Sequence, residues 1–487
     1  MLSKASLYIS YNAFAIALGS FQFGLHLGEM NSPENVVSCR TESPISGILP
    51  SCVSMTTSSY AFATAIFAIG GLLGALMGPC LVRMGRKTTL LFNTIPGILG
   101  PLLMALAINP GMLTTGRLIS GVQSGLAMAI VPQYLSEITP KKWTGPVGLV
   151  PQLSCVLGIL FTQALALGLS NVPGWRIIFS LGGFIQLTQS ILLIWAIESP
   201  LYYYETGSKK KAEQTLKVFL DHQEASSVID AWDASGNNSI KPRPSLEDIW
   251  HAVYDWRKAF AVISLLMLGQ QLCGINVVIF YSTTTLNGLL GSFSKYLSVI
   301  ISIVNLFATL LMALFSNRIG RKIPLLHSVF GMTACSALMC FGIVKGIGAL
   351  TAIAAVAFVA SFGVGLGPMP FPMAVEVVNG AAVVGNIAPS FGVAVNLLAT
   401  FVIAYIFPPL REKLGGYVFI IFVVIGVMIF VLFALFVPET SKKQNAGEIW
   451  TRSDGTLMIT AAANIVSGDK NDNCHIEKKS TNTSESA

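Results

Sequence analysis

The chain has 487 residues, of which 53% are hydrophobic and only 11% are charged, and its mean hydropathy is +0.68. Soluble domains carry about 25% charged residues, so this composition excludes a soluble protein and predicts a polytopic protein embedded in a lipid bilayer. The net charge of +7 does not indicate a nucleic-acid partner, because basic cytosolic loops of a membrane protein account for it.

Apolar segments of roughly 20 residues, each long enough to cross a bilayer, follow one another along the chain. The first contains Asn12, Gln22 and His26 and is followed by no small-residue cleavage site, so we expect it to stay as a span and not to act as a signal peptide. Twelve spans are expected, at residues 8–28, 58–81, 89–108, 112–134, 146–168, 176–197, 259–283, 296–316, 323–344, 349–375, 386–408 and 417–437.

Loop charge predicts the orientation of these spans. An even number of spans places both termini on one side, and a cytosolic location for them assigns most of the 30 Lys and Arg residues to the cytosol. The exceptions are Arg40, Arg176, Lys295, Lys345, Arg411 and Lys413 on the opposite side and Arg117 inside a span. We therefore expect cytosolic termini, and Asn-x-Ser/Thr sites at Asn237 and Asn482 that are not glycosylated because they face the cytosol.

The cysteines leave a disulfide in the first loop open and do not indicate a metal site. Cys39 and Cys52 lie in the first non-cytosolic loop, where a disulfide and two free thiols are both compatible with the sequence. The other cysteines are scattered without the spacing of metal ligands. We expect neither a metal nor a cofactor.

Two motifs recur in the second half of the chain. RMGRK at 83–87 returns as RIGRK at 318–322, and PQYLSEITP at 132–140 has a weaker counterpart in PFPMAVEVVN at 370–379. Duplicated halves imply a solute path between them that opens alternately to either side, which is typical of a carrier. The expected division is an N-terminal six-helix bundle (1–197), a cytosolic linker with amphipathic helices at 209–220 and 249–260 (198–258), a C-terminal six-helix bundle (259–437) and a disordered cytosolic tail (438–487).

Glycines and prolines mark where helices approach closely or break. Gly70, Gly74 and Gly78 are spaced by four residues, and so are Arg117, Gly121 and Gly125, which permits close contact between the second and fourth spans. The tenth span cannot be a regular helix and is expected to contain a hinge or a static kink, because it holds Gly363, Gly365, Gly367, Pro368, Pro370 and Pro372.

The seventh span carries the most informative polar groups. Residues 270–282 read QQLCGINVVIFYS, and amides buried in hydrocarbon need partners from neighbouring helices or from a bound solute. At about 100° per residue, Gln270, Gln271 and Asn276 would be spread around most of a regular helix. Either they bond to different helices, or the helix unwinds near Gly274 and all three serve one solute site.

These motifs together resemble the sugar porter branch of the major facilitator superfamily over almost the whole chain. The resemblance rests on GSFQFGLHLGEMNSP at 19–33, the two RxGRK loops, GRLISG at 116–121, PQYLSEITP, ESP at 198–200, QQLCGIN, GLGPMPFPMAVE at 365–376 and VPET at 437–440. It implies an all-α membrane protein of the major facilitator fold, with twelve transmembrane helices in two six-helix bundles and a cytosolic helical linker.

The resemblance also implies a binding site for a small sugar. Amides supply donors and acceptors together, which suits a ring of hydroxyl groups. The implied substrate contacts are Gln22, Gln152, Gln270, Gln271, Asn276, Asn305 and Asn396, with Phe371 as an apolar wall and Glu376 at the cytosolic edge. Taken singly, Gln152 and Asn305 would also fit as helix–helix hydrogen bonds.

Cytosolic loop residues are implied to gate the path, and several depart from the family pattern. The implied gating residues are Arg83, Gly85, Arg86 and Glu137 in the first half and Arg318, Gly320 and Arg321 in the second. Val82 and Asn317 stand where the loop motif usually has Asp, Thr144 and Val383 where it has Arg, and Phe371 and Leu397 where it has Trp. We expect a weaker cytosolic charge network, and the preferred sugar stays open.

Energy coupling centres on the first and fourth spans. Gln22, His26 and Glu29 share one helical stripe, and the buried Arg117 needs a partner. Proton-coupled relatives resemble this layout with Asp at the place of His26, whereas facilitative animal relatives have Asn there. Facilitated diffusion of a monosaccharide or polyol is favoured; a proton-coupled carrier that uses His26 or Glu29 with Arg117 is the alternative.

Other function classes fit less well. The sequence contains no nucleophile motif or phosphate-binding loop that would indicate an enzyme. A non-transporting nutrient receptor is disfavoured by the short tail, and a carrier of another small metabolite remains an alternative. His26 and the short N terminus resemble fungal vacuolar-membrane members, so a vacuolar location of a monomer is favoured over the plasma membrane.

Overall fold

The computed structural model describes residues 4–40, 49–139, 147–234, 251, 253–291, 293–378, 384–441 and 449–450. Thr144 and Val383, the two glycosylation motifs and nearly all of the expected tail lie outside these ranges. Asn317 and Arg318 belong to a described helix, but their side chains are not described. Every regular element within the described ranges is a helix.

The first half of the chain forms one bundle of membrane-length helices. Its helices are α1 (Lys4–Gly28), α3 (Thr57–Leu81), α4 (Arg86–Phe92) followed by α5 (Thr94–Ala105), α6 (Pro110–Ile138), α8 (Val150–Leu169) and α9 (Gly174–Ile194), with the short α2 (Glu34–Val37) and η1 (Val82–Met84) between them. These helices follow the first six expected spans in order, with ends that differ by a few residues.

The second half repeats this arrangement. Its helices are α14 (Arg257–Leu272), α15 (Ile275–Leu290), α16 (Phe293–Ile319), α17 (Lys322–Val344), α18 (Gly348–Val364), α19 (Pro370–Glu376), α20 (Val384–Leu414) and α21 (Val418–Phe436), with the 3-10 turn η3 (Gly415–Tyr417) before α21. By length and composition, nine helical stretches of the described residues could cross a membrane, and one of them contains both α20 and α21. The fold class predicted from the sequence is confirmed.

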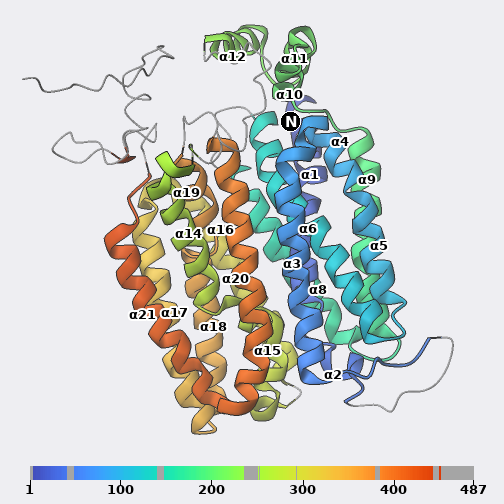
Figure 1. The fold of residues 1–487 in the computed structure, drawn as a ribbon, viewed down its shortest axis with the longest axis vertical. Helices are drawn as coiled ribbons and strands as arrows, with labels where there is room; N and C mark the ends of the chain where they lie inside the picture. The colour runs from blue at the N-terminus through green and yellow to red at the C-terminus, as the bar shows by residue number, and fades with distance from the viewer. Residues whose placement is uncertain are drawn as a thin grey trace, which may run out of the picture.

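The two halves stand side by side as separate groups of helices (Figure 1). Three linker helices, α10 (Pro200–Glu205), α11 (Lys209–Leu216) and α12 (His222–Ala234), lie beyond one end of the first half, and α2 lies at the other end. Helix α20 packs against α3 and α16 packs against α8, so these pairs join the bundles. Ala68, Ala75, Met128, Val393 and Leu397 form a buried apolar cluster across this junction.

Small residues bring α3 and α6 into backbone contact, as their spacing predicts. A Cβ atom added to Gly125 would lie 1.9 Å from the carbonyl oxygen of Gly71, and one added to Gly70 would lie 2.0 Å from that of Leu118. Only glycine leaves room for this approach. The close packing fixes α6, and with it Arg117, against the first helices of the bundle.

Two spans of the second half are interrupted. The first interruption follows α14, because Gly274 adopts a left-handed conformation with φ of +93° before α15 begins at Ile275. The other separates α18 from α19 and leaves the carbonyl groups of Leu366 and Gly367 outside regular helix. Both interruptions lie at the positions where the sequence indicated a break.

A disulfide-bonded cap closes the end of the first bundle that lies opposite the linker helices. Cys39 and Cys52 form a disulfide, which settles the alternative left open by the sequence. The Trp175 indole donates to the Ser51 carbonyl at 2.9 Å, and the Arg176 guanidinium donates to the Pro50 carbonyl at 2.7 Å. The bonds attach the loop to the start of α9.

Candidate functional site

A cavity lies between the two bundles, with about 650 Å³ of empty space that includes its solvent opening. Helices α1, α6 and α8 line one wall, and α14, α15, α16, α18, α19 and α20 line the other. The wall residues include Phe23, Leu27, Met128, Gln152, Cys155, Val156, Ile159, Gln270, Gln271, Asn276, Asn305, Phe371, Asn396 and Thr400.

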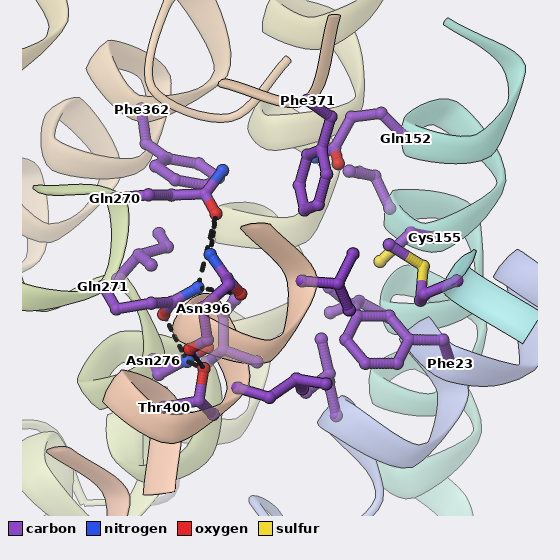
Figure 2. A pocket seen from close by; sticks show the side chains of 18 of the residues that line it. Phe23, Gln152, Cys155, Gln270, Gln271, Asn276, Phe362, Phe371, Asn396 and Thr400 are labelled. Atoms are coloured by element: carbon purple, nitrogen blue, oxygen red, sulfur yellow. Dashed lines mark hydrogen bonds between the residues drawn. The ribbon is translucent and has the colours of Figure 1, made fainter. Parts of the chain in front are cut away.

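Amide side chains on the C-terminal wall form a connected hydrogen-bond network (Figure 2). Gln271 Nε2 donates to Asn396 Oδ1 at 2.9 Å, and Asn396 Nδ2 donates to Gln270 Oε1 at 2.6 Å. Asn276 Nδ2 donates to Gln271 Oε1 at 2.6 Å and to Thr400 Oγ1 at 3.1 Å. The network holds donors and acceptors at the cavity wall in fixed positions, as recognition of a hydroxylated solute requires.

The break at Gly274 makes this network geometrically feasible. Because the left-handed conformation of Gly274 interrupts the helix, Asn276 at the start of α15 reaches Gln271 near the end of α14. Gln270 uses its Nε2 for the carbonyl groups of Leu366 and Gly367, at 2.7 and 3.1 Å, which lie in the other interruption. The two interrupted spans therefore support each other and orient the amides.

The structure brings most of the predicted contact residues to this cavity. Gln152, Gln270, Gln271, Asn276, Asn305, Phe371 and Asn396 all line it. Sequence reasoning missed Thr400, Phe23, Leu27 and Cys155. Thr400 follows Asn396 by one helical turn and so shares its face, a spacing that was available in the sequence.

Gln22 does not lie in the cavity lining. Its Nε2 donates to the Gly182 carbonyl at 2.8 Å, and its Oε1 accepts from Gln123 Nε2 at 3.2 Å, entirely inside the first bundle. This is the helix–helix role that any intramembrane amide also fits. We therefore correct the expectation that Gln22 contacts the solute.

Glu376 also lies away from the cavity lining, in an ion pair with Arg321 at 3.0 Å. Thr440 Oγ1 donates to the other oxygen of the Glu376 carboxylate. The first bundle has the matching arrangement: Arg86 pairs with Glu137 at 2.9 Å, and Ser199 donates to Glu137. Each set joins helix ends within its own bundle, so Glu376 lies in the counterpart of the Arg86–Glu137 ion pair and not at the edge of the cavity.

Two further carboxylates complete these matching networks. Glu198 accepts from the backbone N–H groups of Lys87 and Thr88, and Glu439 accepts from those of Arg321 and Lys322. Burial alone would raise the pKa of Glu439, but these N–H groups together with those of Ser441 and Thr440 bring its pKa below the usual value.

Loop glycines leave space for these two carboxylates. A Cβ on Gly85 would lie 2.3 Å from Glu198 Oε2, and Gly320 also has a positive φ, of +84°, beside Glu439. Arg83 is exposed in η1. The glycines of the two repeated motifs thus have the same packing role in both bundles.

Arg117 is completely buried in the first bundle beside Glu29 and His26. Its Nη1 donates to Glu29 Oε1 at 2.7 Å and to the His26 carbonyl at 2.9 Å, and its guanidinium carbon lies 4.5 Å from the Phe67 ring centroid. His26 Nδ1 lies 3.0 Å from the same Glu29 oxygen. The ion-pair partner of Arg117 is therefore Glu29, one helical turn beyond the position suggested by proton-coupled relatives.

Polar contacts join the bundles at the end that carries the disulfide cap. Asn31 Nδ2, just after α1, donates to Ser282 Oγ at 2.8 Å, and Asn31 Oδ1 accepts from the Thr283 backbone at 3.1 Å. Ser282 and Thr283 belong to α15 of the second bundle. These contacts hold the two bundles together on that side of the cavity.

Two helix bundles around a shared cavity with an amide network on its wall define a membrane carrier of the major facilitator type. The family model for the "Sugar (and other) transporter" family matches residues 12–446, and the chain belongs to that family.

Among related sequences, the probable metabolite transport protein YBR241C of Saccharomyces cerevisiae is 34% identical, over 89% of this chain and 93% of that protein. Vacuolar protein sorting-associated protein 73 of the same yeast is 30% identical, over 90% and 95%. Facilitated glucose transporter protein 1 of Caenorhabditis elegans is 31% identical, over 90% of both chains.

A solved structure shares the fold. The partially occluded inward-open form of the xylose transporter XylE from E. coli superposes with a TM-score of 0.75 at 20% sequence identity, covering 90% of this chain and all of that one. At that identity the likeness shows the arrangement of helices and nothing about the solute.

Proposed function

We propose that the protein carries a monosaccharide or a related polyol across a membrane by alternating access. The observation that carries this proposal is the connected amide network of Gln270, Gln271, Asn276 and Asn396 at a cavity between two bundles. Neutral amides replace the hydration of hydroxyl groups without binding ions strongly. The glucose transporter relative and the family assignment support the same class of solute.

Facilitated diffusion is the mode of transport that the charge arrangement favours. Glu29 and Arg117 compensate each other inside the first bundle, and neither lines the cavity. A compensated buried pair needs no proton in order to be stable. Transport down the solute gradient alone therefore fits these contacts.

One observation favours proton coupling as a second candidate. Within the described residues, the buried atoms Glu29 Oε2 and His26 Nε2 have no hydrogen-bond partner. Such atoms are available to a proton if the other conformation of the carrier admits water to them. His26 and Glu29 are thus the two groups to test.

Uptake into proteoliposomes that contain the purified protein tests both proposals. Labelled hexoses, pentoses and polyols are supplied with and without an inward proton gradient, to the wild type and to His26→Asn. We expect uptake of at least one of these solutes at a rate that the gradient does not change in either protein. Accumulation above equilibrium under the gradient in the wild type, lost in His26→Asn, would establish coupling instead.

The same experiment separates the other function classes. Saturable sugar binding without uptake would identify a nutrient receptor, and no binding of any polyhydroxylated solute would contradict the sugar proposal. A carrier of another metabolite would show uptake only of that compound in a wider panel. Each outcome is read against liposomes without protein.

We place the protein in the vacuolar membrane as a monomer, with both termini in the cytosol. The basic linker and loop residues support this orientation by the positive-inside rule. The yeast relative named for vacuolar protein sorting supports the vacuolar location. Fluorescent tagging at either terminus, followed by microscopy and protease protection, tests location and orientation together.

A further inference from the structure

Helix α19 is a short element that connects the cavity to one end of the second bundle. It has seven residues, Pro370–Glu376, and its second residue, Phe371, lines the cavity. The break before it contains the carbonyl groups of Leu366 and Gly367, which accept from Gln270 of the amide network at 2.7 and 3.1 Å. The start of α19 is therefore bonded to the proposed solute site.

Phe371 is the part of α19 that a solute meets. Among the described residues of this helix, only Phe371 lines the cavity. Figure 2 shows its ring beside Gln152 of the opposite wall. An aromatic ring packs against the apolar C–H face of a sugar and keeps water away from it. A shift of α19 would therefore change the contact between this ring and the solute.

The chain that follows α21 holds the far end of α19. Glu376, the last residue of the helix, accepts from Thr440 Oγ1, and the carbonyl of the next residue, Val377, accepts from the Trp450 indole N–H at 3.0 Å. The last carbonyl groups of a helix have no partner within the helix, and a buried carbonyl without a partner is unfavourable. Trp450 therefore satisfies a group that α19 cannot satisfy by itself.

Trp450 is packed into the second bundle. Its side chain and that of Ile449 are buried, and both belong to the same apolar cluster as Met373, Ala374 and Val377 at the end of α19. A tryptophan that buries its ring and also satisfies its N–H is held both by packing and by a directed hydrogen bond. The contact therefore restricts where the end of α19 can lie.

We propose that Trp450 is a positioning residue for transport, which fixes the end of α19 and thereby holds Phe371 in the cavity wall. This inference rests on the proposed function as a sugar carrier. It deepens that function because Trp450 is not among the residues that line the cavity. When the end of α19 is released, Phe371 occupies the wall only part of the time, and the apparent affinity falls with the fraction of binding-competent protein.

Uptake by the full-length protein in proteoliposomes tests the inference. The solute is the labelled hexose, pentose or polyol of the panel above that the wild type takes up fastest. We expect Trp450→Ala to raise the half-saturation constant about three- to tenfold, since the loss of one net hydrogen bond has roughly that effect. Trp450→Phe keeps a buried ring without the N–H and should give a smaller rise. Trp195→Ala, at an exposed tryptophan after α9, is the matched control and keeps the wild-type constant.

A double-mutant cycle tests whether Trp450 acts through Phe371. Phe371→Ala removes the ring and should raise the half-saturation constant by itself. If Trp450 acts only by holding that ring, the double variant has the same constant as Phe371→Ala, because the two changes are coupled and do not add. Effects that multiply in full would show that Trp450 acts elsewhere. That result, or an unchanged constant in either single variant, overturns the inference.

Hydrogen exchange followed by mass spectrometry gives a readout that needs no solute. We expect the backbone amides of residues 370–378 to exchange about three- to tenfold faster in Trp450→Ala, while those of α21 keep the wild-type rate. Unchanged exchange in α19 overturns the inference. A variant that merely misfolds would lower the maximal rate of uptake at a constant half-saturation value and would speed exchange in both helices.

The proposed function and this inference fail in different ways. Uptake whose half-saturation constant does not respond to Trp450→Ala overturns the inference and leaves the carrier function standing. No uptake and no binding of any member of the panel by the wild type overturns both. Size-exclusion profiles of the detergent-solubilised variants confirm that each comparison uses folded protein.

Discussion

Glu29→Gln is expected to lower the free energy of unfolding by about 3–5 kcal/mol, because it leaves the buried guanidinium of Arg117 without a counter-charge. Glu29 and Arg117 are both completely inaccessible to solvent and lie 2.7 Å apart. The carbonyl of His26 and the ring of Phe67 stay near Arg117, but neither carries a negative charge. Thermal unfolding of the purified protein in detergent measures the effect.

Two further variants separate charge imbalance from loss of packing. In the double variant Glu29→Met with Arg117→Met, no unpaired charge remains, and we expect much of the lost stability to return. Glu412→Gln changes an exposed carboxylate and should leave the unfolding temperature nearly unchanged. If the double variant is as unstable as the sum of its single variants, the ion pair is not the source of the effect.

Gln271→Leu is expected to weaken sugar binding by about 10- to 100-fold while the protein stays folded. Gln271 is the centre of the amide network, since it contacts Gln270, Asn276 and Asn396. Its loss removes hydrogen bonds to the solute, and two such bonds at a net value of about 0.5–1.5 kcal/mol each, with 1.4 kcal/mol per tenfold change in affinity, give roughly this range. The half-saturation constant for uptake and an equilibrium binding assay measure it.

Two other glutamines provide the comparison. Gln223→Leu, on the exposed face of α12, is the control for the substitution itself. Gln22→Leu changes an amide that the structure places inside the first bundle, so we expect lower stability but an affinity close to that of the wild type. If Gln22→Leu loses as much affinity as Gln271→Leu, Gln22 contributes to solute binding and the correction made above is wrong.

The sequence predicted the main features of the fold because membrane spans follow from local composition. The interruption at Gly274 was also predictable, since three amides that cannot share one face of a regular helix require a break if they serve one site. The amide side chains that line the cavity followed from motif resemblance, whereas most of the apolar lining residues did not. The preference for helix over strand needed no tertiary information.

The sequence could not decide which hydrogen-bond or ion-pair partner each buried polar side chain has. Gln22 and Gln271 are both amides within spans, and only the packing of α1 against α6 and α9 shows that Gln22 is satisfied inside its own bundle. Arg117 had two candidate partners on the facing stripe, His26 and Glu29, and the packing of α1 brings the Glu29 carboxylate to 2.7 Å from the guanidinium. The apolar character of the first-bundle wall comes from α1, α6 and α8 together, so no local pattern revealed it.

The covalent bond between Cys39 and Cys52 provides a marker of compartment. Thiols exposed to cytosolic glutathione stay reduced, so this end of the first bundle belongs in an oxidising space, which agrees with the proposed orientation. The interiors of the secretory organelles and the cell exterior share that property. The disulfide would therefore form during synthesis, before the protein is sorted. The same oxidised protein would then reach either the vacuolar membrane or the plasma membrane.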